Sequence, residues 1–288
     1  MMLQSNEIIR GVADTLVRAS TSFSPGQKKA YQEAILQETD PKAVWALRAI
    51  LDNAEKAEEL RFPFCDDTGI PHAFLKIGDD AVTPPGLLRL IDEGIAEGLR
   101  RLPGRPMGVI GNDMERITQE KGLSDRSEDV LPAPVQIRRM PGSRIRLTIL
   151  MLGGGPEIRG LTQRVFHKHN LDIVRQEMIR RATEGAKLLG CQPCVLGFGV
   201  GRTQVEAASY ALEAYMDANF DVQSDLEREI TEAVNECGAG PLGLHGKTTV
   251  LRTFLKVGPQ RASGIRVIAL RVGCCFDPRC ASLEWETL

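Results

Sequence analysis

The chain has 288 residues, of which 42% are hydrophobic and 26% charged, and its formal charge at pH 7 is −2. Such a composition is that of an ordinary globular protein, and the small charge gives no reason to expect nucleic acid or an anionic membrane as a partner. No apolar run is long enough to cross a bilayer, and residues 1–11 lack the apolar core of a signal peptide, so we expect a cytoplasmic protein.

The first third of the chain predicts helices around one strand. Residues 3 to about 60 carry apolar side chains at helical spacing, and residues 84–102 open with two prolines and predict an amphipathic helix. Residues 73–78 follow a turn and predict a short strand. The stretch 103–131 is rich in charge and turn formers and predicts an irregular excursion.

The middle of the chain mixes strand and helix signals. Residues 135–137 and 145–149, separated by Pro-Gly-Ser, predict a β-hairpin. Residues 161–188 predict a helix, and Val195–Phe198 predicts a buried strand. A helix is expected over 204–216, because Thr203 and Glu206 match a capping box.

The last part predicts a helix over 225–236 and two closing strands over 248–257 and 266–272. The whole pattern predicts an α/β (mixed α+β) fold with a helical N-terminal layer followed by mixed sheets with flanking helices. We expect one domain over 1–288, made of a helical layer (1–60), a first sheet region (61–160) and a second α/β region (161–288).

Three cysteines stand out because glycine, proline or acidic residues surround each of them: Cys65 in the first sheet region, and Cys191 and Cys274 in the second region. Seven cysteines in a chain with no export signal favour thiols or metal ligation over disulfides. Three thiolates from distant segments can hold an iron–sulfur cube by three corners and leave its fourth iron open for chemistry. The pair Cys191-x-x-Cys194 also suits a redox site or half a zinc site.

Three other motifs each have an ordinary structural explanation. Asp67-Thr-Gly matches the triplet of retroviral proteases, but the chain holds one copy and a turn explains it. Gly246-Lys-Thr-Thr resembles the end of a P-loop, but the glycine spacing fails and a strand, not a helix, is expected to follow. Gly197-Phe-Gly-Val-Gly suits either an anion-binding loop or a tight strand-to-helix turn.

A carboxylate-binding pocket is a further prediction. Gly153-Gly-Gly supplies backbone amides, and Arg100, Arg138, Arg139 and Lys247 supply positive charge.

Together these pieces resemble one family. The order Cys65-Asp-Asp-Thr-Gly, Gly153-Gly-Gly-Pro-Glu, Cys191-x-Pro-x3-Gly-x-Gly-Val-Gly, Gly240-Pro-Leu-Gly-Leu-x-Gly-Lys-Thr-Thr and Cys274 is similar to that of the alpha chain of class I fumarate hydratase and L(+)-tartrate dehydratase. The likeness runs from about residue 45 to 282.

The resemblance implies an oxygen-sensitive [4Fe-4S] cluster with one open iron, held by Cys65, Cys191 and Cys274. Cys275 takes the place of Cys274 if the register is shifted by one. It further implies catalytic roles for Asp67 and Arg100. Substrate contacts are expected from four residues: Asp66, Gly154, Gly155 and Lys247.

The same resemblance implies a hydro-lyase that reversibly removes water from a small hydroxy acid. The open iron acts as a Lewis acid on the hydroxide leaving group while a base takes a proton from the neighbouring carbon. In this family the base belongs to a beta portion that this chain does not contain, so a beta subunit and a homo- or hetero-oligomer are expected.

The chain departs from the family at positions near the substrate. Asp66 replaces a usual glutamine, Pro156 replaces a serine, and Ala262 stands where a histidine precedes the last cluster cysteine. Asp66 adds negative charge, which disfavours a dicarboxylate. The substrate can therefore be a compound other than fumarate or tartrate. The alternative function is that of a non-catalytic relative acting as a binding, sensing or accessory protein.

Overall fold

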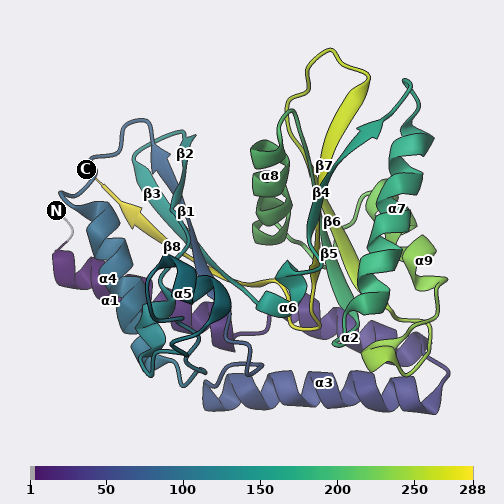
Figure 1. The fold of residues 1–288 in the computed structure, drawn as a ribbon, viewed down its shortest axis with the longest axis horizontal. Helices are drawn as coiled ribbons and strands as arrows, with labels where there is room; N and C mark the ends of the chain where they lie inside the picture. Colours follow the sequence, from purple (N-terminus) through teal and green to yellow (C-terminus); the bar gives the residue numbers. More distant parts are fainter. Residues whose placement is uncertain (1–3, 288) are drawn as a thin grey trace. The chain divides into compact units, whose positions relative to one another are not determined.

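The computed structural model describes residues 4–287, so the expected helical start at residue 3 lies outside it. The described chain divides into two compact units. The first comprises residues up to Ser22, Lys56–Gly154 and residues from Arg279 onward, and the second comprises Phe23–Glu55 and Gly155–Pro278. The mixed α/β fold class is confirmed, since each unit contains one four-stranded mixed sheet with helices beside it (Figure 1). The expected single domain stays a prediction.

The first unit is built on a sheet with the strand order β2-β1-β3-β8. Its strands are β1 (Ile70–Gly78), β2 (Gln136–Met140), β3 (Arg144–Leu152) and β8 (Arg279–Glu286). Strand β2 runs parallel to β1, and the other two pairs are antiparallel.

The expected hairpin between residues 135–137 and 145–149 is wrong, because β1 lies between β2 and β3. The turn that joins them bonds to the end of β1 instead: Asp79 N–H donates to Met140 O at 2.9 Å and Asp80 N–H donates to Gly142 O at 3.1 Å. Strand β2 is short, charged and mostly exposed, which suits a sheet edge. Strand β8 was not expected.

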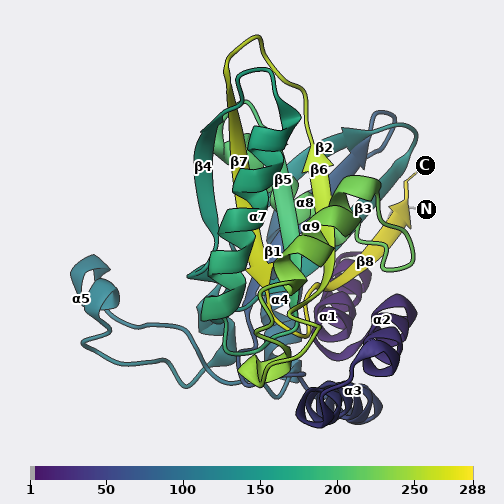
Figure 2. The ribbon, with the colours of Figure 1, turned by 90° about the vertical axis from the view of Figure 1, so that its right-hand side faces the viewer.

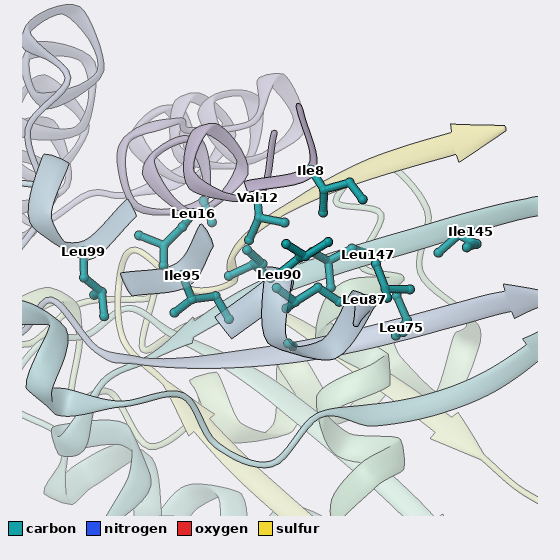
Figure 3. Close-up of a cluster of buried hydrophobic side chains, with 14 of the residues drawn as sticks. Ile8, Val12, Leu16, Leu75, Leu87, Leu90, Ile95, Leu99, Ile145 and Leu147 are labelled. Atoms are coloured by element: carbon teal, nitrogen blue, oxygen red, sulfur yellow. The ribbon is translucent and has the colours of Figure 1, made fainter. Parts of the chain in front are cut away.

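One face of this sheet is covered by α1 (Ser5–Thr21) and α4 (Leu87–Arg101). Alternate residues of the strands and apolar stripes of the two helices form one buried cluster (Figure 3). The helices approach closely at Gly94 and Gly98, where added Cβ atoms would lie 2.5 Å from Val12 Cβ and 2.9 Å from Leu16 Cβ. The excursion 103–131 holds only a short helix, α5 (Asp113–Thr118), and one 3₁₀ turn (Ser127–Val130).

The second unit is built on a sheet with the order β4-β7-β5-β6. Its strands are β4 (Leu161–Phe166), β5 (Cys194–Gly201), β6 (Val250–Val257) and β7 (Ile265–Gly273). Strands β5 and β6 are parallel, and β7 is antiparallel to both β4 and β5. The expected helix over 161–188 is wrong at its start, because residues 161–166 pair with β7 and the helix α7 (Leu171–Leu188) begins only after the cap residue Asn170.

Helices cover both faces of this second sheet. In Figure 2, α7 and α9 (Asp225–Asn235) lie in front of the strands, and α8 (Gln204–Met216) lies behind them. The contacts agree, because Val272 meets Gly185 of α7 while its neighbour Gly273 meets Tyr215 of α8. The remaining helices are α2 (Pro25–Gln37), α3 (Pro41–Leu60), α6 (Gly154–Glu157) and a 3₁₀ turn (Pro241–Gly243).

The glycine-rich segment Gly197–Gly201 lies within β5 and is neither a turn nor an anion-binding loop. A Cβ on Gly199 would lie 2.0 Å from Ala207 O of α8, so glycine permits close packing of strand and helix. The predicted start of α8 is confirmed, since the Thr203 hydroxyl accepts a hydrogen bond from Glu206 N–H at 3.2 Å. The Glu206 carboxylate accepts a hydrogen bond from Arg202 N–H at 2.9 Å.

Among the helices formed by residues 4–287, none is both long enough and apolar enough to cross a membrane.

Candidate active site

The second unit brings two of the predicted thiol ligands onto adjoining segments. Cys191 precedes β5 and Cys274 follows β7. Because these strands are antiparallel neighbours, the start of one lies beside the end of the other. A backbone hydrogen bond joins the segments, with Cys275 N–H donating to Cys191 O at 3.1 Å.

Helix α2 holds the turn that carries Cys274 and Cys275. The Tyr31 hydroxyl donates to Cys275 O at 2.7 Å, and the Gln27 amide donates to Phe276 O and Asp277 O at 3.4 and 3.3 Å. Asp277 closes the turn by accepting Cys274 N–H at 2.9 Å. Burial, and then the nearby thiols of Cys275 and Cys274, raise the pKa of Tyr31 well above its ordinary value, so the hydroxyl remains a donor.

The thiols differ in how well they suit ligation. Residues 4–287 include all seven cysteines, and none of them forms a disulfide. Cys194 is fully buried, and burial raises the pKa of its thiol far above the ordinary value. A neutral buried thiol is a poor metal ligand or redox partner, which argues against a Cys191–Cys194 zinc or redox site.

The first unit contains the segment with Cys65, Asp66 and Asp67, just before β1. The Cys65 thiol lies 3.4 Å from Asp66 Oδ1, and Arg105 Nη1 donates to Asp66 Oδ2 at 3.1 Å. Arg105 N–H also donates to the buried Thr68 hydroxyl at 3.1 Å. Sequence reasoning missed Arg105, which lies in the irregular excursion where no periodic pattern marks it.

Arg279 fixes the backbone of this segment. It is 2% exposed, and its Nη1 donates to Asp67 O at 2.8 Å and Thr68 O at 3.1 Å. Gly69 follows with φ +92°, as the turn interpretation of Asp67-Thr-Gly requires. Sequence reasoning also missed Arg279, whose only signal is its position five residues after Cys274.

Gly153 lies where two of these side chains meet. A Cβ added to it would lie 2.8 Å from Asp67 Oδ2 and 3.0 Å from Arg279 Nη2. Added Cβ atoms on Gly154 and Gly155 would meet nothing within 4 Å. Among residues 4–287, the space for a side chain is therefore filled at Gly153 and empty at the two glycines predicted to contact substrate.

Arg100 and Lys247 have partners of their own. Arg100 pairs with Glu97 at 3.0 Å and Glu128 at 3.3 Å, and the hydrogen bond to Glu97 is the main cause of its raised pKa. Lys247 Nζ donates to Gln37 O at 3.2 Å and borders a polar cavity of about 380 Å³ in the second unit. Strand β6 begins three residues after Lys247, as expected, whereas a P-loop would be followed by a helix. Their functional roles stay predictions.

No three His, Cys, Asp or Glu side chains within residues 4–287 form a group arranged to hold a metal ion. The predicted ligands are divided, with Cys65 in the first unit and Cys191 and Cys274 in the second. The donor chemistry nevertheless fits a cluster, because thiolates are its usual ligands and two of the three lie on hydrogen-bonded segments.

Comparison with known proteins gives consistent likenesses over most of the chain. The family model described as fumarate hydratase (Fumerase) matches residues 9–283. The protein named "Putative L(+)-tartrate dehydratase subunit alpha" of Methanocaldococcus jannaschii is 29% identical over 286 residues, covering 93% of this chain and 93% of that protein. The L(+)-tartrate dehydratase subunit alpha of Escherichia coli (strain K12) is 22% identical over 276 residues, covering 93% of this chain and 88% of that protein. The "Putative fumarate hydratase class I" of Geobacillus stearothermophilus is 25% identical over 255 residues, covering 82% of this chain and 47% of that protein.

Proposed function

The chain belongs to the fumarate hydratase (Fumerase) family, and from this premise we propose that it is the cluster-bearing subunit of an enzyme that dehydrates a small hydroxy acid. It is a hydro-lyase of the type represented by fumarate hydratase and tartrate dehydratase. The iron–sulfur cluster, the residues that hold it and the substrate belong to the proposal.

The hydrogen bond between Cys275 N–H and Cys191 O is the observation that carries this proposal, because it joins two of the thiol segments. We propose Cys191 and Cys274 as two ligands and Cys65 as the third, with Cys275 as the alternative to Cys274. When bound, a [4Fe-4S] cluster on three thiolates supplies an open iron that acts as a Lewis acid toward the substrate's hydroxyl and carboxylate.

Asp67 is the proposed catalytic residue of this chain. Its backbone is fixed by Arg279, and its carboxylate lies against Gly153, so its position is constrained from two sides. A carboxylate held in this way accepts a hydrogen bond from the substrate hydroxyl and orients it. Among the described residues, the space where side chains of Gly154 and Gly155 would lie is empty, which leaves room there for a substrate carboxylate.

Arg105 affects how far the negative charge of Asp66 disfavours a substrate carboxylate. The negative charge of Asp66 disfavours a dicarboxylate, but the Arg105 guanidinium 3.1 Å away offsets that charge. Both side chains are largely exposed, so their pair is weak and either partner is available to a substrate group. This arrangement is compatible with a substrate that carries a carboxylate and does not select fumarate or tartrate.

A second polypeptide is part of the proposal. Two relatives are named as alpha subunits, and this chain spans 47% of the longer fumarate hydratase class I relative. We propose that a beta subunit corresponds to the remaining part of that relative and supplies the base that takes a proton from carbon.

Anaerobic reconstitution of the full chain with iron and sulfide tests the cluster. We expect a broad absorbance at about 400 nm and about four irons per chain, as for thiolate-bound cubes. Replacing Cys65, Cys191 or Cys274 by Ser is expected to abolish the signal. The control Cys237→Ser, a half-buried thiol beside Thr249, is expected to keep it.

The outcomes separate the two functions considered. If the reconstituted wild-type chain shows no such absorbance, the cluster proposal fails. If the cluster assembles but no hydroxy acid is dehydrated even with a beta-type partner present, the chain is the non-catalytic relative.

A further inference from the structure

The second unit contains a cavity of about 230 Å³ that the proposed chemistry does not use. It lies where β5 and β6 end, beside the start of α7 and the first turn of α9. These four elements lie side by side in Figure 2. Cys194 is at the other end of β5, six residues from Val200 of the cavity wall, which corresponds to about 20 Å along a strand. The cavity is therefore separate from the thiol segments.

The wall of the cavity is apolar. It is formed by five side chains: Val174, Met178, Val200, Leu226 and Leu255. Met178 and Val200 are buried, and at the rim Leu171 and Val257 are 66% and 59% exposed. An apolar wall with exposed apolar residues at its edge favours a hydrocarbon group over water.

The polar groups that line the cavity favour an anion. They include Arg266, His169 and Gln260, and none of the described residues that line the cavity is Asp or Glu. Arg266 Nη1 donates to Ser263 O at 3.1 Å and to Ile265 O at 2.9 Å, so backbone carbonyls hold the guanidinium, and no carboxylate among residues 4–287 forms an ion pair with it. A fixed guanidinium beside an apolar chamber is suited to a carboxylate head group.

Two histidines shape one side of this cavity. The buried His167 ring lies 2.7 Å, through Nε2, from Ser263 O, and its Nδ1 accepts His169 N–H at 2.9 Å. This bond holds His169 at φ +55°, a conformation that non-glycine residues rarely adopt. The two rings pack edge to face, with centroids 5.1 Å apart. Ser263 O thus serves both Arg266 and His167, which ties the cationic and histidine sides of the cavity together.

We propose that this cavity binds a small amphipathic monocarboxylate, with its hydrocarbon chain on the apolar wall and its carboxylate on Arg266. A chain of four to six carbons is the size class we infer from the cavity volume. The site is independent of the proposed cluster and of the hydroxy-acid substrate.

Isothermal titration calorimetry of the full chain with butanoate, pentanoate and hexanoate tests the site. We expect saturable binding that strengthens about fourfold with each added methylene, as burial of a CH₂ group predicts. Hexan-1-ol, which keeps the chain and lacks the charge, is expected to bind at least about tenfold more weakly than hexanoate.

Two substitutions and one control variant locate the binding. Arg266→Gln is expected to weaken hexanoate at least about tenfold, whereas Arg164→Gln, the same change at an exposed arginine of β4 outside the cavity, is expected to leave it unchanged. Val174→Trp fills the cavity and is expected to abolish binding while the melting temperature of the chain stays near that of the wild type.

The absence of hexanoate binding to the wild-type chain overturns the proposal. Equal binding of hexanoate and hexan-1-ol, or equal effects of Arg266→Gln and Arg164→Gln, overturns the assignment of the carboxylate to Arg266. If Val174→Trp does not fold, the comparison of Arg266→Gln with Arg164→Gln decides whether hexanoate binds in this cavity.

Discussion

Neighbouring glycines of the Gly153-Gly-Gly run have different packing environments. A Cβ on Gly153 would lie 2.8 Å from the Asp67 carboxylate and 3.0 Å from the Arg279 guanidinium, so packing within the first unit already favours a glycine there. Gly154 has open space where a side chain would be, and no contact within residues 4–287 excludes an alanine. If Gly154 is needed, the reason lies in what binds beside it.

Alanine substitutions at these two positions are therefore expected to separate stability from activity. Gly153→Ala should lower the free energy of unfolding by about 1–3 kcal/mol, because its Cβ displaces buried groups. Gly154→Ala should change stability by less than ~0.5 kcal/mol but lower turnover of the reconstituted enzyme at least about tenfold. Urea unfolding and a dehydration assay measure the two effects. Wild-type turnover in Gly154→Ala contradicts the predicted substrate contact.

Glu206 gives a pH-dependent contribution to stability. Hydrogen bonds lower the pKa of Glu206 to about 2, the largest effect coming from the Arg202 side chain and the next from the Arg202 backbone. A carboxyl whose pKa falls on folding stabilises the fold above its unfolded pKa of about 4.3 and loses that effect as the pH falls toward 2.

We expect the difference in urea midpoint between wild type and Glu206→Gln to shrink as the pH is lowered from about 5 to 3. Because the pair is solvent-exposed, added salt should reduce the difference at pH 5. A difference that stays constant with pH would show that Glu206 acts only by its shape.

At the scale of elements, close contact of α1 and α4 is the feature most open to test. Gly94 and Gly98 lie one turn apart on α4 and face Val12 and Leu16 of α1. Alanine favours a helix over glycine by about 1 kcal/mol, but a Cβ 2.5 Å from Val12 Cβ cannot be accommodated without moving a helix. Overpacking of this kind outweighs the helix propensity.

Gly94→Ala is expected to destabilise the chain by about 1–3 kcal/mol in urea unfolding. The double variant Gly94→Ala with Val12→Ala should recover part of that loss, because Val12→Ala removes the obstructing methyl groups. Strictly additive effects of the two substitutions would contradict direct contact between these positions.

Local patterns in the sequence predicted most elements but not their partners. The Thr203 cap predicted α8 to the residue, and helical spacing predicted α4 to within three residues, because those signals lie within one element. The position of β1 between β2 and β3 depends on contacts between residues that are distant in the sequence. From the sequence alone, two short strands joined by a turn resemble a hairpin. Residues 161–166 read as helix for the same reason, since pairing with β7 decides their conformation.

The candidate site shows a similar division. Its cysteines and glycines could be found from the sequence because each lies in a distinctive local setting. Arg105 and Arg279 could not, since their relevance comes from hydrogen bonds to Asp66 and Asp67 across long stretches of chain.

At the scale of the whole molecule, the chain passes between its two units four times, at residues 22/23, 55/56, 154/155 and 278/279. Neither unit is a continuous segment, so neither can be expected to fold from a simple fragment. Experiments on partner binding therefore need the full chain.

We expect the full chain to copurify with a beta-type subunit when the two are expressed together without air. Turnover of a hydroxy acid should then exceed that of the reconstituted chain alone by at least about 100-fold, because general-base catalysis contributes that much. Equal turnover with and without the partner would contradict the proposed division of the site.

The contact between Arg279 and the Asp67 segment also sets an order of events during synthesis. Strand β8 completes the sheet of the first unit, yet Arg279 at its start is synthesised 212 residues after Asp67. Until residue 279 has emerged, nothing holds the Asp67 and Thr68 carbonyls by way of that guanidinium. If Cys65 is a cluster ligand as proposed, we expect iron loading there to be a late step of maturation, and a nascent chain stalled before Arg279 should leave this thiol segment open to oxidants.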